Sequence, residues 1–128
     1  MSKHESWRTR QYWKEVGGLL IEEFYAVRRS DKNNTAGRHI DGVIVLGEKE
    51  QIAKSSVYDL QGKDIIVIQT KASRLGMYLM GQAFFSRELM KRFKPNSIRV
   101  VAICKQSDVE MEKLCAEHNI QVVVIPDK

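Results

Sequence analysis

The sequence predicts an α/β protein: a mixed β-sheet flanked by helices on both faces. Short runs dense in Val and Ile alternate along the chain with amphipathic segments of helical period. Two of the runs, residues 98–104 and 121–125, are apolar almost without a break, which is typical of parallel strands buried on both faces. The 128 residues contain no repeat or Pro/Ser-rich linker, so residues 1–128 are expected to form a single domain.

The first element is expected to be a long helix over residues 6 to about 28. Its apolar residues recur at three- and four-residue steps, the period of one helix face. They are Trp13, Val16, Leu20, Phe24 and Val27. A turn-rich loop, residues 30–37, follows.

Two strands are expected next, at residues 39–46 and 64–71, because both segments are rich in Val and Ile. The intervening segment is ambiguous. It could hold a third short strand at residues 56–60, since no strong helical period competes there.

The second half of the chain alternates between helix and strand. Residues 76–93 are expected to form a helix that Pro95 stops. A third helix, residues 107–118 with Ser107 as its N-cap, should connect the two buried strands.

Composition limits the class of protein. No apolar run approaches the roughly 18 residues of a membrane span, and no apolar leader follows the polar start, so we expect a cytoplasmic protein with no membrane partner. Cys104 and Cys115 lack metal-site spacing and are expected to be free thiols.

The net charge of +5 is concentrated in the middle of the chain. Residues 72–99 hold six basic side chains and one acid, which fits a polyanion-binding face, although on charge alone a solvated surface is the more common use of such residues. The cations expected to contact nucleic-acid phosphates are Arg74, Arg87, Lys91 and Arg92.

Three polar residues stand out in the apolar strands. Asp41 interrupts the first strand, and a buried carboxylate should meet a cation. Gln69 and Lys71 close the second strand and should point to one face, with Thr70 on the other. Paired antiparallel, the two strands would bring an acid, an amide and an ammonium together.

The segments Ile40-Asp41-Gly-Val-Ile and Ile66-Val-Ile-Gln69-Thr-Lys71, followed by a helix, resemble the PD-(D/E)xK nuclease superfamily, in its Mrr-like Q-x-K form. The resemblance implies a restriction-endonuclease-like core with the order α-β-β-(β)-α-β-α-β. It puts the family's Asp at Asp41 and its leading-helix acid at Glu22 or Glu23. Two departures are Ile40 in place of Pro and Gln69 in place of an acid.

These residues suit a divalent metal such as Mg²⁺ or Mn²⁺, which takes oxygen ligands and keeps several waters. Asp41 is the expected anchor, with the Gln69 amide oxygen and the Thr70 carbonyl beside it. Helix phase places Glu23 toward the core, so it is preferred over Glu22 as the second carboxylate. Lys71 would orient the attacking water or stabilise charge on phosphorus.

The same helical phase argument applies to residues 76–93. It puts Gln82 within an apolar arc that includes Tyr78 and Phe85, where Gln82 could brace the metal ligands. The opposite stripe holds Met77, Met80 and Phe84, which suggests a homodimer contact.

The leading hypothesis is a Mg²⁺-dependent DNA endonuclease in which Glu23, Asp41, Gln69 and Lys71 act together. A larger complex could supply its specificity, and RNA as a substrate stays open. The alternatives are a non-catalytic DNA-binding or assembly module on the same fold and a Holliday-junction resolvase.

Overall fold

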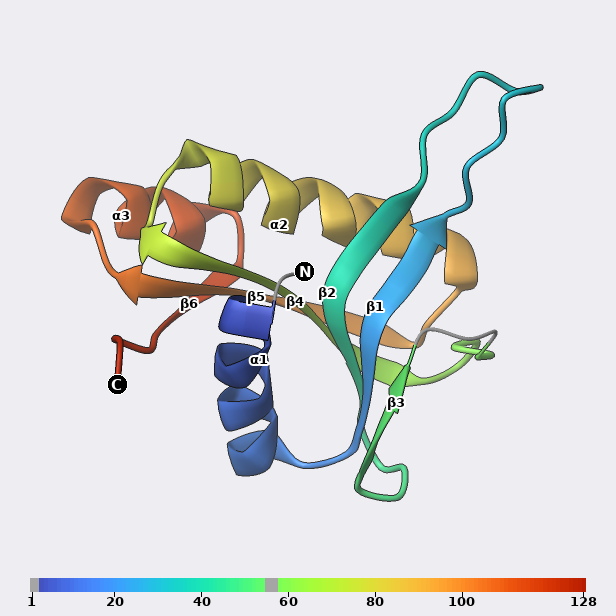
Figure 1. Ribbon diagram of the computed structural model, residues 1–128, viewed down its shortest axis with the longest axis horizontal. Coiled ribbons are helices and arrows are strands. Elements are labelled where there is room, and N and C mark those ends of the chain that lie inside the picture. The colour runs from blue at the N-terminus through green and yellow to red at the C-terminus, as the bar shows by residue number, and fades with distance from the viewer. Residues whose placement is uncertain (1–2, 55–57) are drawn as a thin grey trace.

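The computed structural model describes residues 3–54 and 58–128 and shows an α/β protein built on one six-stranded mixed sheet (Figure 1). The strands lie in the order β3-β1-β2-β4-β5-β6. The elements in chain order are α1 (Lys3–Val16), β1 (Leu19–Val27), β2 (Arg38–Val45), β3 (Gln51–Lys54), β4 (Asp64–Arg74), α2 (Met77–Met90), a 3-10 turn (Lys91–Phe93), β5 (Ser97–Gln106), α3 (Val109–Glu117) and β6 (Ile120–Val124).

The sheet is antiparallel in its first half and parallel in its second. β1, β2 and β4 pair antiparallel, while β4, β5 and β6 run parallel. The unbroken apolar runs predicted the parallel direction for β5 and β6. β3 joins the other edge, parallel to β1. The mixed sheet is therefore confirmed.

Helices cover both faces of the sheet, as expected. α1 packs on one face through Tyr12, against a core that includes Leu20 and Ile68. α2 and α3 pack on the opposite face, where Leu79 and Cys115 are fully buried. No helix among the described residues is long and apolar enough to cross a membrane.

The expected first helix, residues 6–28, is wrong in its second half. α1 ends at Val16, and Gly17 and Gly18 follow with φ of 84° and 81°, a left-handed conformation that terminates a helix and that glycine adopts without strain. β1 then fills the place between β3 and β2 in the sheet. Tertiary pairing thus overrides a helical period that Leu19–Val27 carries only by coincidence.

Two smaller predictions also need correction. The third strand is β3 at Gln51–Lys54; of the expected residues 56–60, residues 58–60 are not in a strand and the others lie outside the described residues. The N-cap of α3 is Asp108 rather than Ser107, because the Asp108 carboxylate accepts hydrogen bonds from the backbone N–H groups of Glu110 and Met111.

The connection between β1 and β2 projects away from the rest of the molecule as a narrow ribbon (Figure 1). We call residues 28–37 the arm. Its two sides are joined by a pair of backbone hydrogen bonds between Ser30 and Thr35, of 2.9 and 3.0 Å. The arm is therefore an ordered hairpin extension of the sheet.

Candidate functional site

The candidate site lies where β2 and β4 separate. The register between these strands ends at the pair Gly42 and Ile68. One residue further, the Asp41 Oδ2 atom accepts a hydrogen bond of 2.9 Å from the Thr70 backbone N–H. The Asp41 carboxylate thus accepts the bond that a backbone carbonyl would accept in a continuous ladder. This contact places the carboxylate directly beside the Gln69–Lys71 segment.

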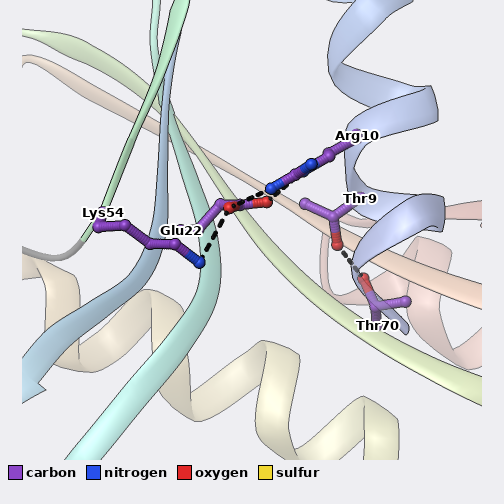
Figure 2. Close-up of polar contacts among 5 residues, drawn as sticks. All are labelled: Thr9, Arg10, Glu22, Lys54 and Thr70. Carbon is purple, nitrogen blue, oxygen red and sulfur yellow. Dashed lines mark hydrogen bonds and ion pairs between the residues drawn. The ribbon is translucent and has the colours of Figure 1, made fainter. Parts of the chain in front are cut away.

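The two faces of β4 are used as the sequence predicted. On the α2 face, Gln69 Nε2 donates to Ser86 Oγ at 2.7 Å, and Lys71 Nζ lies 4.8 Å from the centre of the Tyr78 ring. On the α1 face, the Thr70 hydroxyl is 2.8 Å from that of Thr9, as Figure 2 shows. Gln69 and Lys71 therefore share one face and Thr70 the other.

Glu23 lies on β1, on the strand next to Asp41, and not on a helix. The flanking pairs Glu22–Gly42 and Phe24–Ile40 place it opposite Asp41 in the register. Its φ of 53° is left-handed, which is uncommon for a non-glycine residue within a strand. The helical reasoning for Glu23 was wrong, yet its position remains adjacent to Asp41.

Glu22, the other acid considered for the site, is committed to a structural ion pair. Its side chain is 2% exposed and accepts two hydrogen bonds from Arg10, of 2.8 and 2.9 Å, with Lys54 Nζ at 3.5 Å (Figure 2). The Arg10 hydrogen bonds are the largest cause of a lowered Glu22 pKa, and Arg10 in turn has a raised pKa. The Glu22 carboxylate is therefore ionised, and its charge is balanced by Arg10 and Lys54 on the α1 face of the sheet.

The predicted phase of α2 is partly wrong. Gln82 is exposed on the rim of a cavity, and Tyr78 and Phe85 are exposed by 68% and 65%. Ser86, one turn after Gln82, is the buried polar residue that braces Gln69. The phase error arose because apolar residues surround α2 on nearly all sides, so its period gives a weak indication of the buried face.

The outward stripe expected on α2 is also partly wrong, because it depended on the same helical phase. Met77 is 73% exposed, but Met80 is buried and Phe84 packs against the core. The large apolar side chains that α2 exposes are instead Met77, Tyr78 and Phe85.

The predicted phosphate-contacting cations have different surroundings. Arg74 is exposed at the end of β4. Arg87 donates to the carbonyls of His118 and Asn119, at 2.8 and 3.2 Å, at the C-terminal end of α3. The other two have protein partners as well: Lys91 pairs with Glu88, and Arg92 reaches the Ala26 carbonyl at 3.4 Å.

A cavity of about 640 Å³ opens on the α2 side of the strand separation. Arg38, His39 and Ile40 of β2 form one wall, and Gln69 lies at its base. Residues of α2, including Tyr78, Gln82 and Phe85, form the other wall. Gln69, which is only 4% exposed, thus borders the cavity from the sheet.

The donor set suits a hard cation that keeps most of its water. Within the described part of the chain, no three His, Cys, Asp or Glu side chains form a metal-binding group. The side chains with oxygen atoms on these neighbouring strands include one amide, Gln69, and two carboxylates, Asp41 and Glu23. Mg²⁺ is commonly held by one or two carboxylates with water and substrate phosphate completing six ligands, so these residues fit it.

The comparisons with known proteins give no match: none was found in a scan against protein-family models, a search of curated proteins or a search of solved structures. The function is therefore proposed from the residues themselves. Asp41 of β2 lies beside the Gln69–Lys71 segment of β4, and Gln69 lines the open cavity.

Proposed function

We propose that this protein is a Mg²⁺-dependent DNA endonuclease. The observation that carries the proposal is the hydrogen bond from the Thr70 N–H to Asp41, because it joins the acid of one strand to the Gln69–Lys71 segment of the next. The restriction-endonuclease-like resemblance requires this adjacency. The observed order of elements is α-β-β-β-β-α-β-α-β, with β1 in addition to the strands that the resemblance implied.

Asp41, Gln69 and Glu23 would hold the metal, which would polarise the phosphate and acidify a bound water. The Thr70 N–H fixes one carboxylate oxygen of Asp41, and Ser86 fixes the orientation of the Gln69 amide. Lys71 keeps its ammonium on the same strand face as Gln69, where it would orient the attacking water and stabilise the negative charge that develops on the phosphate.

The test is cleavage of supercoiled and linear DNA with Mg²⁺ or Mn²⁺ by the wild-type protein and by Asp41→Asn and Lys71→Ala variants. Each substitution should lower the rate by about 100-fold or more, the equivalent of several kcal/mol of transition-state stabilisation. Matched controls are Asp59→Asn and Lys113→Ala, which change the same residue types at exposed positions. A Lys71→Ala protein that cuts as fast as the wild type would contradict the mechanism.

A second candidate is a non-catalytic DNA-binding module, and the observation that favours it is Gln69. A neutral amide in place of an acid weakens the attraction for a divalent cation. DNA binding without heat of metal binding in calorimetry, and without cleavage, would support the module. Cleavage confined to four-way junctions would instead support a junction resolvase, and the same assay with RNA would define the nucleic acid.

A further inference from the structure

We propose that the arm, residues 28–37, enters the major groove of B-form duplex DNA and positions the duplex over the candidate site. This inference depends on the DNA substrate of the proposed function, and it identifies both the form of that substrate and the part of the chain that holds it. The arm is separate from the basic stretch 72–99 that the sequence singled out.

Charge is the first observation. The arm and its root carry four cations against one acid; the cations are Arg28, Arg29, Lys32 and Arg38, and all four are exposed. The single acid, Asp31, is paired with Arg29 at 3.2 Å. A projecting segment with this balance attracts a polyanion and gains affinity from released counterions.

The side chains of the arm also decide the kind of partner. Between residues 28 and 37 the largest aliphatic residue is Ala36, so the arm has no apolar anchor to bury in a protein interface. Asn33, Asn34 and Thr35 are exposed near the tip, and these residue types hydrogen-bond to base edges and phosphates. Nucleic acid is therefore favoured over a protein partner.

The shape of the arm specifies the duplex. A two-stranded β-ribbon fits the major groove of B-form DNA, which is about 12 Å wide. The major groove of A-form duplex RNA is too narrow for it. The arm, a hairpin closed by the Ser30–Thr35 pair, should thus prefer duplex DNA over duplex RNA of the same sequence.

The root of the arm connects it to the candidate site. The His39 and Tyr25 rings are in tilted contact across the two strands, with ring centres 4.0 Å apart, and the Arg28 guanidinium lies 5.6 Å from the centre of the Tyr25 ring. Arg38 and His39 also line the cavity that leads to Gln69. A duplex held by the arm would consequently pass this cavity with its backbone close to the strand separation.

The test is the affinity of the wild-type protein and of an Arg28→Gln, Arg29→Gln, Lys32→Gln triple variant for a short DNA duplex, by fluorescence anisotropy in EDTA. Without metal, cleavage does not interfere. The matched control is Lys14→Gln, Lys49→Gln, Lys113→Gln, which removes the same charge from exposed positions on α1, in the β2–β3 turn and on α3.

The arm variant should bind about 10- to 100-fold more weakly at about 0.1 M salt, with the slope of log affinity against log salt shallower by about 2.7. The control should retain nearly all of its affinity, and wild-type protein should bind duplex DNA more tightly than duplex RNA. Equal affinities and slopes for both variants, or no DNA preference, would overturn the proposal. The proposed nuclease fails separately, if bound DNA stays uncut with Mg²⁺ and Mn²⁺.

Discussion

Gln69 determines how strongly the candidate site can attract a metal. Its amide nitrogen donates to Ser86 Oγ, which fixes the orientation of the amide group. A hydroxyl that now accepts this bond can equally donate one, and Ser86 could therefore serve a carboxylate at position 69 without rearrangement. The local structure is compatible with either residue type.

A Gln69→Glu variant should accordingly bind Mg²⁺ about tenfold more tightly or better, because it adds a third charged ligand to Asp41 and Glu23. Isothermal titration calorimetry measures this directly. Gln82→Glu is the matched control, since it adds the same charge at the cavity rim on α2. Equal gains for both variants would show that only the general field of the cavity has changed, and that residue 69 is not a ligand.

Glu23 adds a conformational feature to the same site. A left-handed backbone in a strand costs free energy in a residue with a side chain, and such residues are often found at functional sites. Here it lies opposite Asp41, so the irregularity of β1 coincides with the proposed ligands. Glu23 is the described acid nearest to Asp41 in the register, and we retain it as the second carboxylate.

Among the elements, α1 and β1 are joined by the ion pair of Glu22 with Arg10 and Lys54 (Figure 2). The Glu22 side chain is almost wholly buried, whereas that of Arg10 is 45% exposed. Removal of the carboxylate would leave Arg10 able to reach water. The unfolding free energy lost on removal of the Glu22 carboxylate should therefore be moderate.

A Glu22→Gln variant should lose about 2 kcal/mol of unfolding free energy at neutral pH, the scale of hydrogen bonds to a charged group. Because folding lowers the Glu22 pKa below its usual 4.5, the ion pair stabilises the protein above that pH and ceases to do so as the pH falls through the lowered value. Urea unfolding at several pH values checks this. The difference between variant and wild type should shrink below about pH 4, and a constant difference would contradict it.

The packing of α1 on β2 depends on Gly42. A Cβ atom there would lie 2.9 Å from Thr9 Cγ2 and 3.2 Å from Leu20 Cδ1. Thr9 is also the residue whose hydroxyl contacts Thr70, so a shift of α1 would reach the candidate site.

Gly42→Ala should destabilise the protein by about 1–3 kcal/mol through overpacking, and it should reduce metal binding in calorimetry. Gly81→Ala is the control: a Cβ atom on this α2 residue meets nothing within 4 Å, and alanine should stabilise the helix by about 0.5–1 kcal/mol. Thermal unfolding, monitored by circular dichroism, measures the stability of both variants. Equal melting temperatures for wild type and Gly42→Ala would mean that α1 adjusts freely.

At the scale of the whole molecule, the sequence predicted those elements whose pattern matched their environment. The apolar runs of β5 and β6 identified buried parallel strands, and strand alternation placed Gln69 and Lys71 of β4 on one face. β1 could not be predicted in this way, since its residues satisfy a helical period and only their place in the sheet selects a strand. The choice between Glu22 and Glu23 depended on that error.

Some residues that other elements contribute near the site could not be predicted from the sequence either. Arg10 and Thr9 act through contacts between segments far apart in the chain, and no local pattern distinguishes them from ordinary surface or core residues. Helical phase did place Ser86 on the apolar face of α2, but its contact with Gln69 was not predicted. The homodimer and a larger complex stay predictions, with Met77, Tyr78 and Phe85 as the apolar residues that α2 exposes.

The projecting arm also makes the chain easy to cut in one place. Trypsin cleaves after arginine and lysine, and Arg28, Arg29 and Lys32 are exposed on a narrow ribbon. A nick there would divide the polypeptide between β1 and β2, yet β1 is held by ladders to both β2 and β3. The two fragments should stay associated in the native fold. A nicked protein would therefore lack a continuous arm while it keeps the rest of its structure.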